Sequence, residues 1–213
     1  GAVFNTNIRP RLEMVCGSSP KTSKKYCEAY GFKRAANTWE ELVKDKKVEA
    51  VIIASPQSTH LKIALMALSL GKPVFCEKPL GVSVEDGKKM VAAAEKSGAV
   101  NMMGFNYIRT PASQFVRKLV SEGEIGDITW FRGEHTEDFY SDPNIPATWR
   151  ATGLENGTMG DLAPHMINAA LAIMGPIKSL SADVATVHSS RPGGTVDNDD
   201  HAQMMCTFKN GAM

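Results

Sequence analysis

The chain has 213 residues, of which 43% are hydrophobic and 22% charged, and its formal net charge is +1. This composition is that of an ordinary globular protein with one large or two modest domains, and it excludes a basic nucleic-acid surface or a polybasic membrane tether. From this balance of charge we expect a small-molecule partner and no nucleic acid. No apolar run approaches the roughly 20 residues of a membrane helix, so we expect no membrane partner either.

Short apolar runs alternate with amphipathic stretches along the first half of the chain. We predict strands over 12–16, 50–54, 73–76 and 100–105, and helices over 21–30, 38–46, 61–70 and 83–97. Pro20 suits a first helical turn and Gly31 a left-handed C-cap. Thr38 and Glu41 have the spacing of a capping box. This order predicts a Rossmann-like doubly wound parallel sheet, with the β-branched strand 50–54 buried on both faces.

After Tyr107 the regular alternation of short apolar runs and amphipathic stretches ends. We expect helices over 111–122 and about 164–173, a Pro- and Asp-rich loop over 138–146, and long alternating strands over 125–134, 177–188 and 201–208. Such strands predict a mainly antiparallel open sheet, which would suit a homodimer or homotetramer interface. We therefore place a dinucleotide-binding domain at residues 1–107 and an α+β substrate and oligomerisation domain at residues 108–213.

One expected element is missing from the sequence. A dinucleotide-binding fold opens with a strand and a Gly-rich turn, and no GxGxxG occurs here. The chain starts without Met and stops in a strand-like segment at residues 210–213, so we expect both ends to be cut. The four cysteines form no CxxC pair and no signal sequence is visible. We expect reduced thiols, no metal site and a cytoplasmic location.

Glu77 and Lys78 form the first polar motif. They come directly after the predicted strand 73–76, at the carboxyl end where α/β sheets place their chemistry. Pro79 ends that strand and restricts the backbone at Lys78. Taken alone, the pair is equally compatible with an ordinary solvated turn.

Asp161 and His165 form the second motif. They lie four residues apart and share a face if this stretch is helical. Pro164 is compatible with a first helical turn, which would place Asp161 near the positive end of the helix dipole. Alone, such a pair is more often a helix cap beside a hydrogen-bonded histidine than a catalytic pair.

The polar loop 55–60 is the third motif, and it follows the most apolar strand. A loop there can present backbone N–H groups to a cofactor, or it can simply begin a helix.

The three motifs together resemble the glucose–fructose oxidoreductase/inositol dehydrogenase (GFO/IDH/MocA) family. That family has an EKP element after a Rossmann strand and a later D-x-x-x-H element, here Glu77-Lys78-Pro79 and Asp161 with His165. The likeness extends over nearly the whole chain. It implies an NAD(P)-dependent dehydrogenase that transfers a hydride between the cofactor and a CH–OH group of a sugar, cyclitol or related polyol.

The resemblance implies catalytic roles for Lys78, Asp161 and His165. Lys78 would stabilise alkoxide charge, His165 would act as general base, and Asp161 would orient the substrate or the imidazole. The expected cofactor contacts come from Ser18, Ser19, Lys21, Ser55, Pro56, Gln57, His60, Glu77, Lys78 and Asn106. The expected substrate contacts come from His135, Trp149 and Arg150. Three other readings stay open, in which His135 faces solvent, Trp149 anchors the core and Arg150 pairs with an acid elsewhere.

Two departures from the family pattern bear on the pocket and the cofactor. Ala163, Pro164 and Asn168 stand where the family often has Gly and an acid. Gly17-Ser18-Ser19 stands where NAD-preferring members place an Asp, which would bind the ribose 2′-hydroxyl. Without that acid and with Lys21 close by, the sequence leaves both NAD and NADP open and favours NADP.

Two alternative functions stay open. One is an NAD-dependent glycosidase of the same fold, and the other is a non-catalytic protein that senses a nucleotide. The presence of Lys78, Asp161 and His165 together argues against the sensor, which would not need all three.

Overall fold

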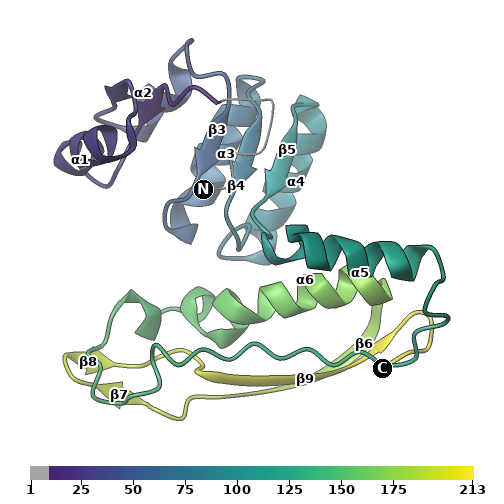
Figure 1. Cartoon of the computed structure of the whole chain (residues 1–213). Helices are drawn as coiled ribbons and strands as arrows, with labels where there is room; N and C mark the ends of the chain where they lie inside the picture. Colours follow the sequence, from purple (N-terminus) through teal and green to yellow (C-terminus); the bar gives the residue numbers. More distant parts are fainter. Residues whose placement is uncertain (1–9) are drawn as a thin grey trace. The chain divides into compact units, whose positions relative to one another are not determined.

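The computed structural model describes residues 10–213. The chain forms two compact units, Gly1–Gly104 and Phe105–Met213, and Figure 1 shows the elements of each. The division falls a few residues before the boundary that the sequence analysis placed at residue 107. Across the described residues, no helix combines the length and the apolar character that crossing a membrane requires.

The first unit alternates strands and helices, and it includes a short strand, Arg34–Ala35, that the sequence analysis did not predict. In chain order they are β1 (Met14–Val15), α1 (Pro20–Tyr30), β2 (Arg34–Ala35), α2 (Trp39–Lys44), β3 (Val51–Ile53), η1 (Gln57–Thr59), α3 (His60–Ser69), β4 (Val74–Cys76), α4 (Val84–Ser97) and β5 (Asn101–Met103). All strand pairs in this unit are parallel, β1 with β2 and β3–β4–β5 in that order. The Rossmann-like parallel fold is therefore confirmed, with strands shorter than predicted.

Local capping fixes the first helices where the sequence predicted them. The Ser19 hydroxyl accepts a hydrogen bond from the backbone N–H three residues on, and Gly31 ends α1 at φ 74°. The Thr38 hydroxyl accepts from the N–H of Glu41 at 3.2 Å. The Glu41 carboxylate accepts from the N–H of Asn37 at 2.9 Å, one residue before the partner that a capping box requires. The capping-box prediction is thus half correct.

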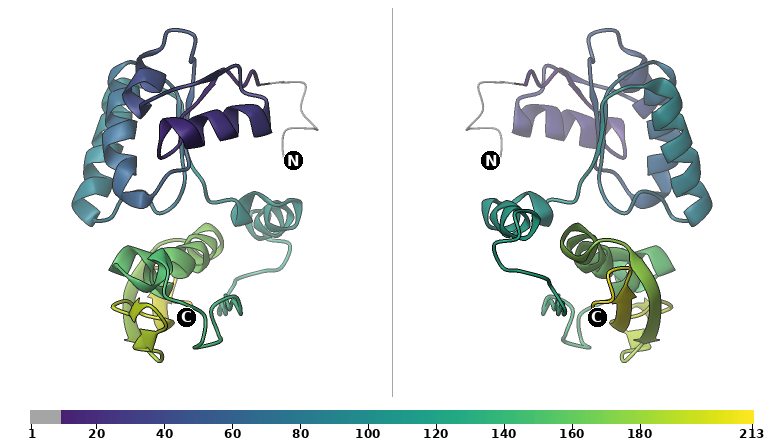
Figure 2. Two further views of the ribbon diagram at one scale, coloured as in Figure 1. Left: turned by 90° about the vertical axis from the view of Figure 1, so that its left-hand side faces the viewer. Right: turned by 90° about the vertical axis from the view of Figure 1, so that its right-hand side faces the viewer.

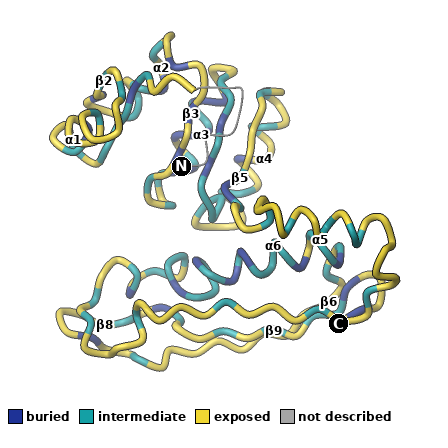
Figure 3. The backbone as a smooth tube through the Cα atoms, in the orientation of Figure 1, coloured by how far each residue is buried: buried dark blue, intermediate teal, exposed yellow. Residues whose placement is uncertain are grey.

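The predicted burial of strand β3 on both faces is wrong. Val51 and Ile53 are each only 2% exposed and pack with α3 and α4 in the core, whereas Ile52 between them is 74% exposed. Figure 3 shows this alternation of buried and exposed chain along the strand. Successive side chains of a strand point to opposite faces, and α3 and α4 cover only the face of Val51. The same face continues through Phe75, the register partner of Ile52, which is half-buried, and Met102, the register partner of Phe75, which is 49% exposed.

The second unit packs a long helix on an antiparallel sheet. Its elements are η2 (Tyr107–Arg109), α5 (Pro111–Ser121), η3 (Trp149–Ala151), η4 (Leu154–Asn156), the π-helical turn η5 (Thr158–Leu162), α6 (Ala163–Met174), β6 (Ile177–Ala185), β7 (Ser190–Arg191), β8 (Gly194–Thr195) and β9 (His201–Phe208). Strands β6 and β9 pair antiparallel, as do β7 and β8. Figure 2 shows α6 beside β6 and β9 from both sides, and Ala170, Met174 and Phe208 are buried together there.

The predicted strand over 125–134 is wrong. In the structure this segment contains no regular strand. The N–H of Phe131 donates to the carbonyl of Met213 at 2.8 Å, and the N–H of Met213 donates to the carbonyl of Thr129 at 3.2 Å. An alternating sequence forms a regular strand only where a neighbour continues the hydrogen-bond ladder, and two bonds to Met213 are too few to make such a ladder.

An ion pair fastens β2 to the chain after α2. The Arg34 guanidinium donates to both carboxylate oxygens of Asp45, at 2.6 and 3.0 Å, and to Glu13 at 3.0 Å. The bidentate hydrogen bond from Arg34 holds the pKa of Asp45 well below its usual range. Because the folded-state pKa is lowered, this pair stabilises the fold above the unfolded-state pKa of about 3.9 and ceases to do so as the pH falls.

We predict that Asp45→Asn flattens the acid side of the stability profile. The free energy of unfolding, measured by urea denaturation from pH 6 to pH 3, should fall less steeply in the variant than in the parent protein. The amide retains an oxygen that can accept from the Lys47 N–H, a bond of 2.8 Å in the parent, so the change removes only the charge and the hydrogen bond from Nη1 of Arg34. Parallel profiles for the two proteins would show that the pair does not contribute.

Candidate active site

Lys78 and Glu77 lie at the carboxyl end of the parallel sheet, directly after β4. The backbone N–H of Glu77 donates to the carbonyl of Ile53 at 2.9 Å, which ties this turn to the end of β3. The Glu77 carboxylate accepts from the N–H of Lys78 at 3.3 Å. Both side chains are half-buried, and the Lys78–Pro79 peptide bond is cis. The prediction that this pair follows a sheet strand is confirmed.

Gly104 lets the end of β5 approach Glu77 closely. Its N–H donates to the carbonyl of Cys76 at 2.8 Å. A Cβ at this position would lie 2.8 Å from Oε2 of Glu77, too close for the carboxylate to stay where it is. Nothing local in the sequence shows that Gly104 lies against a glutamate 27 positions earlier.

His60 corrects one predicted cofactor contact. Its side chain is 1% exposed, and its two ring nitrogens lie 2.9 Å from the carbonyl oxygens of Pro79 and Ser55. A ring enclosed in this way cannot also contact a cofactor. Instead it fastens the loop after β3 to the loop after β4. In the same loop Ser55 and Gln57 are half-buried and Pro56 is exposed.

The turn after β1 carries Ser18, Ser19 and Lys21, on which the expected preference for NADP is based. Ser18 and Lys21 are exposed, whereas Ser19 caps α1. The Ser19 hydroxyl also lies 3.0 Å from that of Thr22, so its hydrogen-bonding capacity is partly used within the helix. The solvent-facing groups of this turn are therefore Ser18 and Lys21.

Cys76 is close in sequence to the motif but does not share its chemistry. Burial raises the pKa of its thiol to about 12, so it remains protonated at neutral pH. In the part of the chain that the structure describes, no three metal-ligating side chains gather.

Asp161 and Arg150 form the central ion pair of the second unit. Asp161 lies in the π-helical turn η5, immediately before α6, and its carboxylate accepts from Nη1 of Arg150. The side chains are 11% and 34% exposed, respectively. The guanidinium also lies over the rings of Trp149, at 4.3 Å, and Phe139, at 5.0 Å from their centroids. Of the two readings of Arg150, the pairing with an acid is thus the one observed.

His165 lies in an aromatic cluster on the first turn of α6. It is 7% exposed, and its ring centroid lies 4.4 Å from that of Tyr107 and 5.9 Å from that of His135. His135 does not face solvent: its side chain is 11% exposed, and Nε2 lies 3.0 Å from the Glu137 carboxylate. The reading of His135 as a solvent-facing residue is therefore wrong.

The remaining predicted residues of this unit are more exposed. Trp149 is 57% exposed, so it is not a core anchor, and its ring packs against the Arg150 guanidinium. Asn106 is exposed and begins η2. Sequence reasoning missed Tyr107, Glu137, Asn198 and Asp199. The contacts of Tyr107, Asn198 and Asp199 join distant segments, for which a single sequence carries no signal, whereas Glu137 contacts His135 only two positions away.

The described residues of the first unit fit a dinucleotide. Polar groups follow β1, β3 and β4 at the carboxyl ends of parallel strands, where open α/β sheets bind such ligands. The Glu77 carboxylate can accept from a ribose hydroxyl, while Ser18 and Lys21 offer donors beyond β1.

Comparison with known proteins identifies the class. Residues 2–105 match a family described as oxidoreductases with an NAD-binding Rossmann fold. Residues 113–213 match the GFO/IDH/MocA C-terminal domain. The chain thus combines a nucleotide-binding fold with the second domain of one oxidoreductase group. It belongs to the GFO/IDH/MocA family.

Individual relatives are dehydrogenases. Levoglucosan dehydrogenase of Pseudarthrobacter phenanthrenivorans is 32% identical over 96% of this chain and 57% of its own length. scyllo-Inositol 2-dehydrogenase (NADP+) of Bacillus subtilis is 30% identical over 68% of this chain and 40% of its own length. A solved complex of levoglucosan dehydrogenase with NADH and levoglucosan matches with a TM-score of 0.90 and 34% identity, covering 95% of this chain and 56% of that one. The matched region therefore covers between 40% and 57% of the length of these relatives.

We predict that Gly104→Ala weakens cofactor binding by displacing the Glu77 carboxylate. The dissociation constant, measured by titration of the full-length protein with NAD+ and NADP+, should rise. Gly87→Ala in α4 is the matched control, because its Cβ would meet only Leu80, at 3.8 Å. That helical substitution should stabilise the fold by about 0.5–1 kcal/mol without changing cofactor affinity. Unchanged affinity in Gly104→Ala would contradict a role for Glu77.

Proposed function

We propose that this protein oxidises a CH–OH group of a sugar, cyclitol or related polyol, with NAD(P) as the hydride acceptor. The observation that carries the proposal is the presence of one motif in each of the two units. Lys78 follows a strand of the nucleotide-binding sheet, and Asp161 and His165 are both buried where η5 leads into α6. The names of the relatives support the same chemistry.

The residues would divide the work of alcohol oxidation. NAD(P), when bound, supplies the hydride acceptor. The Lys78 ammonium would stabilise negative charge that develops on the substrate oxygen. His165 would accept the hydroxyl proton. Asp161, held by the Arg150 guanidinium, would accept a hydrogen bond from the substrate or from the imidazole.

The remaining predicted residues would bind and orient. Glu77, Ser55, Pro56, Gln57 and Asn106 would contact the cofactor, and His60 would hold the loops that carry them. We propose His135 and Trp149 as substrate contacts, whereas Arg150 acts through Asp161. Levoglucosan and scyllo-inositol, which name two of the relatives, are the first substrates to test.

Location and assembly follow the same family argument. We propose a cytoplasmic enzyme that forms a homodimer or homotetramer. The sheet of β6 and β9 supports the assembly, because Leu180 and Val184 on one of its faces are 57% and 51% exposed, and Met205, the register partner of Ser181 on the other face, is 80% exposed. Exposed apolar side chains favour contact with another apolar surface.

We predict cofactor-dependent turnover by the full-length protein. With NAD+ or NADP+ and a panel of levoglucosan, glucose and inositols, absorbance at the wavelength of the reduced cofactor should rise. Lys78→Ala should lower kcat by about 10²–10³-fold, as expected for the loss of a charge that stabilises an oxyanion. Lys88→Ala, at an exposed position of α4, is the matched control and should behave as the parent.

Other outcomes would redirect the proposal. Parent-like turnover by Lys78→Ala would remove Lys78 from the chemistry. Tight cofactor binding without turnover of any sugar or polyol would support the nucleotide sensor. Cleavage of an aryl glycoside that requires NAD+ but accumulates no reduced cofactor would support the glycosidase.

We propose further that NADP is preferred to NAD, because Gly17-Ser18-Ser19 and Lys21 offer no acid to bind the ribose 2′-hydroxyl and repel a 2′-phosphate. Ser18→Asp should reverse the preference, weakening NADP+ by about tenfold or more, which corresponds to about 1.4 kcal/mol. Titration of each cofactor into parent and variant measures this. A parent protein that binds NAD+ much more tightly than NADP+ would contradict the proposal.

A further inference from the structure

We propose that Asn198 and Asp199 are positioning residues, which fix the Arg150–Asp161 ion pair by holding the two backbone segments that carry it. The inference rests on the proposed function, in which Asp161 contacts the substrate or the catalytic imidazole. It assigns a role to a loop, Asp197–Asp200, that lies outside every motif found in the sequence.

Asn198 holds the segment of Arg150. Its side chain is buried, at 4% exposed. The amide Nδ2 donates to the carbonyl of Arg150 at 2.9 Å and to the carbonyl of Gly153 at 3.2 Å. A primary amide has two N–H donors, and here both are used on the backbone that frames η3. The neighbouring Asp197 carboxylate accepts from the N–H of Gly153 at 2.8 Å and reinforces the same segment.

Asp199 holds the segment of Asp161. The first residues of a helix have N–H groups without acceptors inside the helix, and η5 has no side-chain cap from its own N-cap residue. Asp199 supplies the acceptors from a distant part of the chain: its carbonyl accepts from the N–H of Thr158 at 2.9 Å, and its carboxylate accepts from the N–H of Met159, 40 positions away, at 2.7 Å. Asp161 follows in the same turn.

The backbone of η5 and of the residue before it packs closely against Asp199 and against η4. A Cβ at Gly157, the residue before η5, would overlap the Asp199 carboxylate. A Cβ at Gly160 would lie 2.5 Å from the carbonyl oxygen of Leu154, because η5 packs against η4. Only glycine fits these two positions, so η5 has one well-defined placement against the loop.

Two adjacent residues therefore hold both partners of one ion pair. Arg150 and Asp161 are 11 positions apart, and the residues that hold their backbones are consecutive. If Asp199 no longer held the backbone of η5, that turn could shift and carry the Asp161 carboxylate away from the guanidinium. Small misplacements of a catalytic group lower rates steeply, by about 100-fold for 1 Å.

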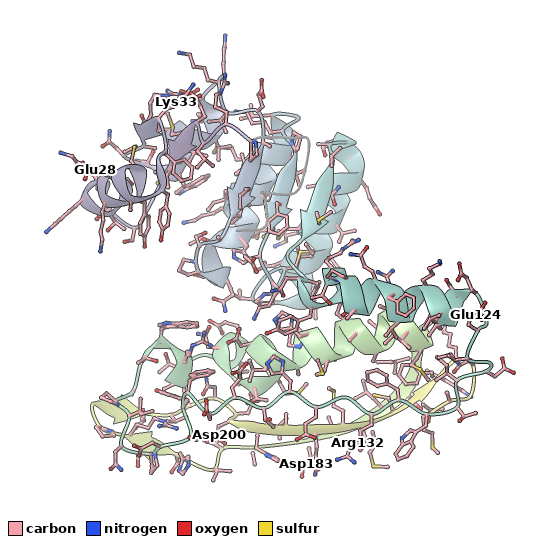
Figure 4. The ribbon with its side chains drawn as sticks, in the orientation of Figure 1. Glu28, Lys33, Glu124, Arg132, Asp183 and Asp200 are labelled. Atoms are coloured by element: carbon pink, nitrogen blue, oxygen red, sulfur yellow. The ribbon has the colours of Figure 1, made fainter. Side chains whose placement is uncertain are left out.

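Asp200 provides a matched control within the same loop. Figure 4 labels this residue. Its carboxylate accepts from the N–H groups of Val187 at 2.7 Å and His188 at 2.9 Å, just after β6. It thus makes the same kind of contact as Asp199, a carboxylate on backbone N–H groups, but to a segment that carries none of the proposed catalytic residues.

The test compares Asp199→Ala, Asp199→Asn and Asp200→Ala in the full-length protein. Asp199→Ala should lower kcat by about 100-fold while the dissociation constant of the cofactor stays unchanged. Asp199→Asn should recover most of that loss, because its amide oxygen still accepts from Met159. Asp200→Ala should keep the parent kcat even if its thermal midpoint falls as far. Equal loss of kcat in Asp199→Ala and Asp200→Ala, or none in Asp199→Ala, would overturn the proposal.

A second readout separates this proposal from the proposed function. Hydrogen exchange of the amides from Met159 to His165 should accelerate in Asp199→Ala and not in Asp200→Ala, whether or not any substrate is turned over. If the parent protein turns over no substrate, the proposed function fails while the exchange data still decide the positioning role. Parent-like exchange in Asp199→Ala would overturn it.

Discussion

The ion pair between Arg150 and Asp161 is the interaction on which the candidate site of the second unit depends. The Asp161 side chain is only 11% exposed, so removing the half-buried Arg150 would leave a largely buried carboxylate without its partner. Arginine suits this place better than lysine, because its planar guanidinium can stack on Trp149 and Phe139 while donating to a carboxylate. The pair therefore fixes the place of the carboxylate and brings two aromatic rings beside it.

The first unit is built on a similar principle. Glu77 and Lys78 stand in a short turn that has little structure of its own. His60 fastens that turn to the loop after β3, and Gly104 leaves room for the Glu77 carboxylate. In both units, residues that touch neither cofactor nor substrate in our proposal determine where the reactive side chains lie.

Elements with local signals could be predicted from the sequence. The bounds of β9 match those expected, since an alternating run gives its own limits, and Ser83 and Gly98 mark both ends of α4. Predictions that depended on which helix or strand packs against a segment were wrong. Whether Ile52 is buried depends on which helices cover its face of the sheet, and whether residues 125–134 form a strand depends on a partner strand beside them.

The same distinction applies to the site. Family motifs indicated Lys78, Asp161 and His165, because their spacing is visible in the sequence. The partner of Arg150 could be expected only as an unspecified acid, and Asp199 could not be expected at all. Its contact with Met159 spans 40 positions, and no local pattern records it.

Hydride transfer from carbon to the cofactor is the central claim, and isotope labelling tests it most directly. The full-length protein would be given a sugar or polyol deuterated at the carbon that bears the reacting hydroxyl, and the reduced cofactor would be analysed by mass spectrometry. Our account predicts that the deuterium is recovered in the nicotinamide ring. Deuterium that is found in water, or that remains on the sugar after turnover, would contradict it.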